Sequence, residues 1–204
     1  MTELSVLQAV RLKGRVTPAD LAATLGARLD DVAPVIERLT AAGLLTEGAT
    51  LRITGSGYDR LAALLTEERA DIDRVAIAAA YDDFRVVNTD FKRLVTDWQL
   101  KGGPDGVPNA HDDADYDAAV LARLDDVHAR TMPIIAAAAA QLPRLSTYAT
   151  KLAAALDKVR AGETTWLTRP LIDSYHTVWF ELHEELIVAT GRTREEAARS
   201  GDAH

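Results

Sequence analysis

The sequence predicts a mainly α-helical protein with one small pair of strands. Apolar residues recur at helical spacing along most of the 204 residues, and this periodicity is the main sequence signal for amphipathic helices. The exception is residues 44–53, which read as two short apolar strands after three short helical segments. Helix, helix, helix, strand pair, helix is the element order of a winged helix-turn-helix. We therefore expect that fold at residues 1–68 and a helical-bundle domain at residues 69–191.

The first two helices have ends that the sequence marks. The apolar residues of segment 4–10 repeat at helical spacing, and Gly14 ends the run. Thr17 is a favourable N-cap, and Pro18 follows at the first helical position, where its missing N–H costs little. Gly26 supplies the turn that ends the second helix.

The third helix is expected to turn an apolar stripe inward and its charged residues outward. The stripe consists of Val32, Val35, Ile36 and Leu39. Asp30 fits the N-cap position, and Gly43 ends the helix. Residues 44–45 and 51–53 then pair as a hairpin, and Thr54 begins a fourth helix.

The stretches AAGLLT at residues 41–46 and LRIT at residues 51–54 resemble the winged-helix domains of bacterial regulators of the MarR type. The resemblance covers residues 3–68. It implies double-stranded DNA as the partner and the third helix as the recognition helix. The predicted DNA contacts are Arg28, Arg38 and Arg52.

Charge leaves alternatives to DNA binding open. The chain has 23 basic and 31 acidic residues, a net charge of −8. Residues 1–70 are nearly neutral, with 8 basic and 9 acidic residues, but Asp30 and Asp31 would face phosphates. The three arginines could instead solubilise the surface. Winged helices also serve as protein-interaction modules, and that is the alternative function.

Residues 70–190 read as a series of helices. In chain order these are residues 67–87, residues 91–98 after a break at residues 88–90, a helix from Asp115, an alanine-rich helix that begins at Pro133, and a helix ended by Gly162. Residues 102–109 contain three glycines and two prolines and form the clearest loop.

The last main helix is predicted over residues 166–186. Its apolar stripe consists of Ile172, Tyr175, Trp179, Leu182 and Leu186, with His176 and His183 beside it. Three acidic residues, Glu181, Glu184 and Glu185, are expected along a solvated edge. Residues 192–204 are expected to form a flexible tail.

Tryptophans from three separate segments predict a small-molecule pocket in the helical domain. Apolar walls with a few polar groups are what such a site needs, and Arg169 or Arg93 would neutralise an acidic effector. The predicted ligand-binding residues are Trp98, Trp166, Arg169, Tyr175, His176, Trp179 and His183. The alternative is that the tryptophans are core residues with hydrogen-bonded N–H groups.

No cofactor, metal site or catalytic residue is predicted. His176 and His183 lie seven positions apart, about 10 Å along a helix, which is too far to share one zinc ion without ligands from other helices such as His128 or His111. Ser174 and His176 would point to different sides of their helix, so they form no nucleophile–base pair. The sequence has no GxSxG, P-loop or GxGxxG motif.

The stretches TDWQL at residues 96–100 and RPLIDSYHTVWFELHEEL at residues 169–186 resemble an actinobacterial all-helical family. Its members occur with winged-helix modules and are associated with phosphoenolpyruvate-utilising enzymes. The resemblance covers residues 75–190 and implies a regulator or accessory protein, without a particular activity.

A cytoplasmic homodimer without membrane contact is expected. The chain has no cysteine, its start lacks the pattern of a signal peptide, and no apolar run approaches the roughly 20 residues of a membrane span. The helix at residues 67–87 would connect the two domains and pack against the same helix of the second protomer. An effector bound in the helical domain would then alter the spacing of the two recognition helices.

Overall fold

The computed structural model describes residues 1–192, which fold mainly as helices. The prediction of a mainly α-helical protein is confirmed. The chain divides into two compact parts, Met1–Asp71 and Ile72–His204, which we call unit 1 and unit 2. The tail predicted at residues 192–204 lies, apart from Arg192, outside the described residues.

Unit 1 contains four helices among its described residues. They are α1 (Glu3–Lys13), α2 (Pro18–Thr24), α3 (Leu29–Ala41) and α4 (Gly55–Glu68). Threonine side chains cap three of them: the Oγ1 atoms of Thr2, Thr17 and Thr54 accept hydrogen bonds from the backbone N–H groups three residues later, which satisfies donors that a helix start leaves unpaired.

The backbone between α3 and α4 pairs on both of its sides. Leu51 forms an antiparallel bridge with Val16, and Ile53 forms one with Leu45. Segment 51–53 therefore lies between two other extended segments. Gly57 allows α4 to begin close to this pairing, because a Cβ atom at that position would collide with the backbone carbonyl of Leu44.

The start of α3 differs from the prediction. Its N-cap is Arg28, which makes no side-chain capping bond, and Asp30 lies inside the first turn. There the Asp30 carboxylate accepts a hydrogen bond from Arg28 Nη2 at 3.2 Å. An acidic residue in the first turn is still favourable, because the helix dipole is positive at that end.

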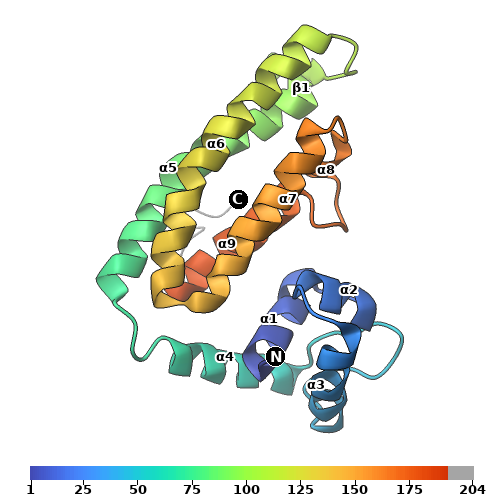
Figure 1. Ribbon diagram of the computed structural model, residues 1–204, viewed down its shortest axis with the longest axis vertical. Coiled ribbons are helices and arrows are strands. Elements are labelled where there is room, and N and C mark those ends of the chain that lie inside the picture. Colours follow the sequence, from blue (N-terminus) through green and yellow to red (C-terminus); the bar gives the residue numbers. More distant parts are fainter. Residues whose placement is uncertain (193–204) are drawn as a thin grey trace. The chain divides into compact units, whose positions relative to one another are not determined.

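Unit 2 is built on a long antiparallel helix pair, α5 and α6, which lie side by side (Figure 1). The described elements are α5 (Arg74–Gln99), β1 (Leu100–Lys101), β2 (Val107–Pro108), α6 (Ala114–Gln141), the 3-10 helix η1 (Pro143–Ser146), α7 (Thr147–Arg160), α8 (Thr165–Thr168) and α9 (Tyr175–Ala189). Strands β1 and β2 pair antiparallel across the predicted loop. Helix α9 contacts α5, α7 and α8 and is buried on most of its sides.

Helix α5 runs without a break, so the predicted interruption at residues 88–90 is wrong. Asn88 is a poor helix former by propensity, but here it is buried and its Oδ1 accepts a hydrogen bond from Trp179 Nε1 at 2.8 Å. Thr89 Oγ1 donates to the carbonyl of Arg85 within the helix. A contact with α9 therefore overrides the local preference of this segment.

Helix α6 also continues where a new helix was predicted to begin, at Pro133. A proline inside a helix leaves the carbonyl four residues earlier without its partner. That residue is Ala129, which is exposed to solvent. Thr131, Ile134 and Ile135 are buried on the opposite side, so packing of that face holds the helix together through the proline.

The single helix predicted over residues 166–186 is divided in the structure. Helix α8 ends at Thr168 and α9 begins at Tyr175, with Ser174 as its N-cap. The break occurs at Pro170, which disfavours helical backbone angles at the residue before it, and Arg169 there has extended angles (φ −60°, ψ 124°). Among the helices that the structure describes, none is both long and apolar enough to cross a lipid bilayer.

Candidate functional site

The outward surface of α3 carries more acidic than basic side chains. Asp30, Asp31, Glu37 and Arg38 are all exposed there. Arg28 forms an ion pair with Asp30, and both side chains are more than 80% exposed, at 81% and 82%. The positions predicted to contact DNA are therefore on the surface, but this helix offers an anion little net positive charge.

Arg15, which the sequence reading missed, lies opposite Arg52 of segment 51–53. The antiparallel bridge between Val16 and Leu51 brings their neighbours Arg15 and Arg52 to facing positions, and both arginines are exposed. Arg15 Nε also donates a hydrogen bond to Thr50 Oγ1 at 3.0 Å. In the sequence, Arg15 is marked only by its place before Val16. No local pattern indicates the pairing, because the partner of Val16 is distant in the chain.

Four of the seven predicted ligand residues lie on α9, and two of them pack into an aromatic seam. The seam consists of Phe84 and Phe91 of α5 with Tyr175 and Trp179 of α9. Ring centroids are 4.3 Å apart for Phe91 and Trp179 and 4.9 Å apart for Phe84 and Trp179. All four rings are buried in the core of unit 2. The ligand pocket predicted around these residues stays a prediction.

The two histidines of α9 have different surroundings. His183 is buried, with its ring 5.3 Å from that of Phe84. His176 is exposed on one side, and its ring lies 6.0 Å from that of Phe91. The partial loss of hydration lowers the pKa of His176. Across residues 1–192, no three His, Asp or Glu side chains are gathered in a way that could hold a metal ion.

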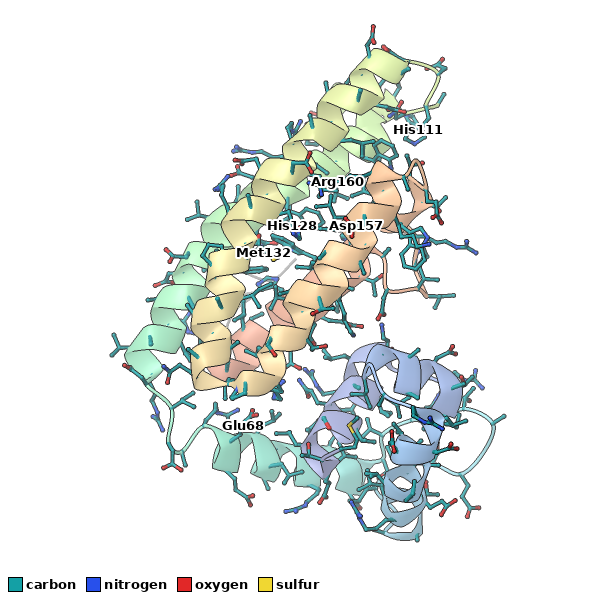
Figure 2. The ribbon with its side chains drawn as sticks, in the orientation of Figure 1. Glu68, His111, His128, Met132, Asp157 and Arg160 are labelled. Carbon is teal, nitrogen blue, oxygen red and sulfur yellow. The ribbon has the colours of Figure 1, made fainter. Side chains whose placement is uncertain are left out.

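The other three predicted ligand residues have partners away from the seam. The Trp98 ring packs on that of His111, with centroids 4.4 Å apart, near the β1–β2 turn (Figure 2). The Lys158 ammonium lies 5.7 Å from the Trp166 ring centroid. Arg169 is exposed in the segment between α8 and α9. The seven residues therefore belong to several parts of unit 2.

A histidine of α6 reaches the seam from its other side. His128 Nδ1 and Tyr175 Oη lie 3.2 Å apart. Figure 2 shows His128 on the side of α6 toward α7, from which Asp157 and Arg160 extend. Burial lowers the pKa of His128, and the charge of Arg160 lowers it further. Burial also raises the pKa of Tyr175 well above its usual range.

These shifts predict that unit 2 loses stability in mild acid. Because His128 and His176 have folded-state pKa values below 6.5, the unfolded chain binds protons more readily. The folded state is therefore most stable above the pKa that the two histidines have in the unfolded chain. This stability is lost as the pH falls through the pKa that they have in the folded protein. The free energy of unfolding should therefore fall as the pH drops from about 7 through the usual histidine pKa of about 6.5. Denaturant unfolding followed by tryptophan fluorescence measures this free energy at each pH. If it falls equally steeply with pH in the variant His128→Gln/His176→Gln, the assignment of the pH dependence to these two histidines is contradicted.

A buried ion ladder joins η1 and α7 to α9. We define it as Arg144 of η1 with Tyr148 and Lys151 of α7, facing Glu181 and Glu185 of α9. Arg144 Nη1 lies 2.6 Å from Glu185 Oε2, and Lys151 Nζ lies 3.6 Å from Glu181 Oε2. Tyr148 Oη donates to Glu185 Oε1 at 3.4 Å. Burial raises the pKa of Tyr148, and the charges of both glutamates add to this effect.

The ladder corrects the expectation that the glutamates of α9 line a solvated edge. Glu181, Glu184 and Glu185 are all buried, with 2%, 6% and 2% of their surface exposed. A buried carboxylate requires an opposite charge or hydrogen-bond donors. The helical spacing of Arg144, Tyr148 and Lys151 across η1 and α7 was a signal for such a partner row, but pairing it with α9 needs the tertiary structure.

A groove of about 880 Å³ runs along the outer side of α5 and α6. Its charged lining residues are Asp90, Lys92, Arg93, Asp97, Arg123, Asp126 and Arg130. Of the residues considered as effector contacts from the sequence, Arg93 lines it, and none of the seven predicted ligand residues does. Periodicity predicts a solvated face at these positions, so the sequence gives no signal that α6 closes one wall of a groove.

Comparison of the chain with known protein families, curated proteins and solved structures finds no match. The resemblances to MarR-type regulators and to an actinobacterial helical family therefore stay predictions.

Proposed function

We propose that the protein is a homodimeric, DNA-binding transcriptional regulator with a winged helix-turn-helix in unit 1 and an effector-sensing helical unit 2. The observation that carries the proposal is the pairing of segment 51–53 with Val16 on one side and Leu45 on the other, next to an exposed α3. A recognition helix followed by a small paired wing is the arrangement that winged helices present to DNA.

In this proposal the wing and α3 have different tasks, because their charges differ. The wing arginines, Arg15 and Arg52, would contact phosphates, because they are exposed and lie on facing positions of one edge. Arg28 and Arg38 would extend from α3 toward the duplex. The carboxylates of α3 oppose non-specific attraction to phosphates, so most of the salt-dependent affinity would come from the wing arginines.

Regulation in this proposal requires two states of the dimer. An effector bound to unit 2 changes the DNA affinity only if it binds the two states with different affinities. Helix α5 begins only two residues after the start of unit 2, so it would be the first element of the helical unit to receive or pass on such a change. We also propose that α5 of one protomer contacts α5 of the other in the homodimer.

Salt-dependent binding tests the DNA part. The duplex upstream of the protein's own gene, labelled for fluorescence anisotropy, should bind with an affinity that falls steeply between about 50 and about 200 mM salt. The variant Arg15→Gln/Arg52→Gln should lower the slope of log K against log salt by about 2, since each lost phosphate contact removes about 0.9. The control variant Arg74→Gln/Lys158→Gln loses the same charge from exposed positions of unit 2 and should keep the slope. Absence of binding at about 50 mM salt would overturn the proposal.

The acidic surface of α3 supports a second candidate, a protein-interaction module without DNA binding. Leu29 is 45% exposed at the start of the helix. The exposed Asp30 and Asp31 follow it directly, and the exposed Glu37 lies further along the same helix. An apolar side chain among carboxylates suits a basic protein surface better than a phosphate backbone. Recovery of a phosphoenolpyruvate-utilising enzyme with the full chain, and its loss in the variant Leu29→Ser/Glu37→Lys, would favour this function.

A further inference from the structure

The groove on α5 and α6 is formed by side chains that repeat along both helices. Thr89, Arg93 and Thr96 lie on one face of α5, and Arg123 and Arg130 lie on the facing side of α6. Its volume of about 880 Å³ is within the range of about 300–1,000 Å³ that small-molecule sites occupy. Pro104, Ala122 and Val127 contribute apolar surface to the lining.

The carboxylates of the groove are already held by arginines from the opposite helix. Asp97 Oδ2 lies 2.7 Å from Arg123 Nη1, and Asp90 Oδ2 lies 2.9 Å from Arg130 Nη1. Arg130 also pairs with Asp126 at 3.2 Å. These ion pairs neutralise the carboxylates of the groove and hold Arg123 and Arg130 in place.

Two cations on α5 remain for a ligand. Arg93 Nη1 lies 3.9 Å from Asp90, at the limit of an ion pair, and its side chain is 73% exposed. Within residues 1–192 the Lys92 ammonium forms no ion pair. Counting all lining residues, the groove holds four cations and three carboxylates in a chain whose net charge is −8. The groove is thus a local positive region on an acidic protein.

Two threonines of the groove are arranged to accept hydrogen bonds. Thr89 Oγ1 donates to the carbonyl of Arg85, and Thr96 Oγ1 donates to the carbonyl of Lys92. Their only protons are then used within α5, so the free lone pairs of both oxygens accept from a ligand. The site therefore combines cationic donors for an anionic group with acceptors for hydroxyl groups.

We propose that this groove binds a small hydroxylated organic anion, with its phosphate or carboxylate group on Lys92 and Arg93 and its hydroxyl groups on Thr89 and Thr96. The site is distinct from the residues of the aromatic seam. The proposal depends only on the groove and does not require the protein to bind DNA.

Calorimetric titration of the full chain at low ionic strength tests the proposal. The probes are glycerol 3-phosphate, malate, and neutral glycerol as a ligand control. Saturable binding of one anion per chain is expected, whereas glycerol should not bind. A response to glycerol 3-phosphate alone identifies a phosphate site, and a response to malate alone identifies a carboxylate site. The proposal is overturned if neither anion binds up to about 10 mM, a concentration that would reveal any site with functional affinity.

Two variants separate the groove from general charge effects. Lys92→Gln/Arg93→Gln should weaken binding at least about tenfold, since each replaced cation removes a charge-assisted hydrogen bond. Arg74→Gln/Lys158→Gln removes the same charge from exposed positions outside the groove lining and should leave the affinity within about twofold. Equal losses in the two double variants would overturn the proposal.

A third variant should increase the affinity. Asp97→Asn removes one carboxylate and releases Arg123 from its ion pair, so binding should tighten severalfold. A gain of affinity cannot result from damage to the fold. Weaker binding by this variant, with helical content unchanged by circular dichroism, would count against the assigned geometry.

Discussion

Replacing Arg144 by leucine is expected to lower the free energy of unfolding of unit 2 by about 3–5 kcal/mol. The variant leaves Glu185, whose side chain is 3% exposed, without the guanidinium that lies 2.6 Å away. A buried carboxylate that loses its counter-charge must either remain ionised in an apolar environment or take up a proton, and both are unfavourable. Urea unfolding followed by tryptophan fluorescence measures the change, since all three tryptophans lie in unit 2.

Two further variants show whether the loss comes from the unpaired charge. Arg160→Leu removes an arginine whose ion pair with Asp125 is more than half exposed on both sides, and it should cost only about 0–1 kcal/mol. Arg144→Leu/Glu185→Leu removes both charges and should restore much of the stability that Arg144→Leu loses. A double variant that is less stable than Arg144→Leu would contradict the importance of the unpaired carboxylate.

Replacing Trp179 by alanine should destabilise unit 2 by about 3–5 kcal/mol, as large-to-small substitutions in a core do. The indole is buried between Phe84 and Phe91, and its Nε1 donates the hydrogen bond that satisfies Asn88 Oδ1. The variant therefore removes ring packing and leaves a buried acceptor of α5 unpaired. The fluorescence of Trp98 and Trp166 reports the unfolding of this variant.

Trp179→Phe separates these two contributions. It keeps a ring in the seam but removes the N–H donor, so the expected loss is about 1–3 kcal/mol. If the seam were a ligand pocket closed by flexible side chains, Trp179→Ala would instead leave the stability of the free protein nearly unchanged. An unfolding free energy for Trp179→Ala within about 1 kcal/mol of the unaltered chain would therefore contradict the packing role.

Short-range signals in the sequence located the helix ends that depend on neighbouring residues. Thr17 and Thr54 are N-caps because a threonine hydroxyl reaches the backbone N–H three residues on. The apolar stripe of α3 is buried as its periodicity predicts. The exposure of Arg28, Arg38 and Arg52 could also be predicted from the sequence, because charged side chains next to buried apolar residues face the solvent.

Tertiary contacts determine the structure at positions where it differs from what the local sequence favours. Asn88 and Pro133 are poor helix residues, yet α5 and α6 pass through both because their neighbours are buried against other helices. Polar character alone predicted solvent for Glu181 and Glu185, but the row of Arg144, Tyr148 and Lys151 covers them. Such positions depend on residues far away in the chain.

The sequence by itself determined that this protein is mainly helical and where most helices begin, because capping and amphipathic periodicity act over a few residues. Only the tertiary structure decided which faces of those helices meet. The aromatic seam, the buried ion ladder and the groove each depend on contacts between residues far apart in the chain. In the groove, the ion pair between Asp97 and Arg123 joins residues that are 26 positions apart. Pairing over such distances is selected by burial and charge in the folded chain, and no local pattern encodes it.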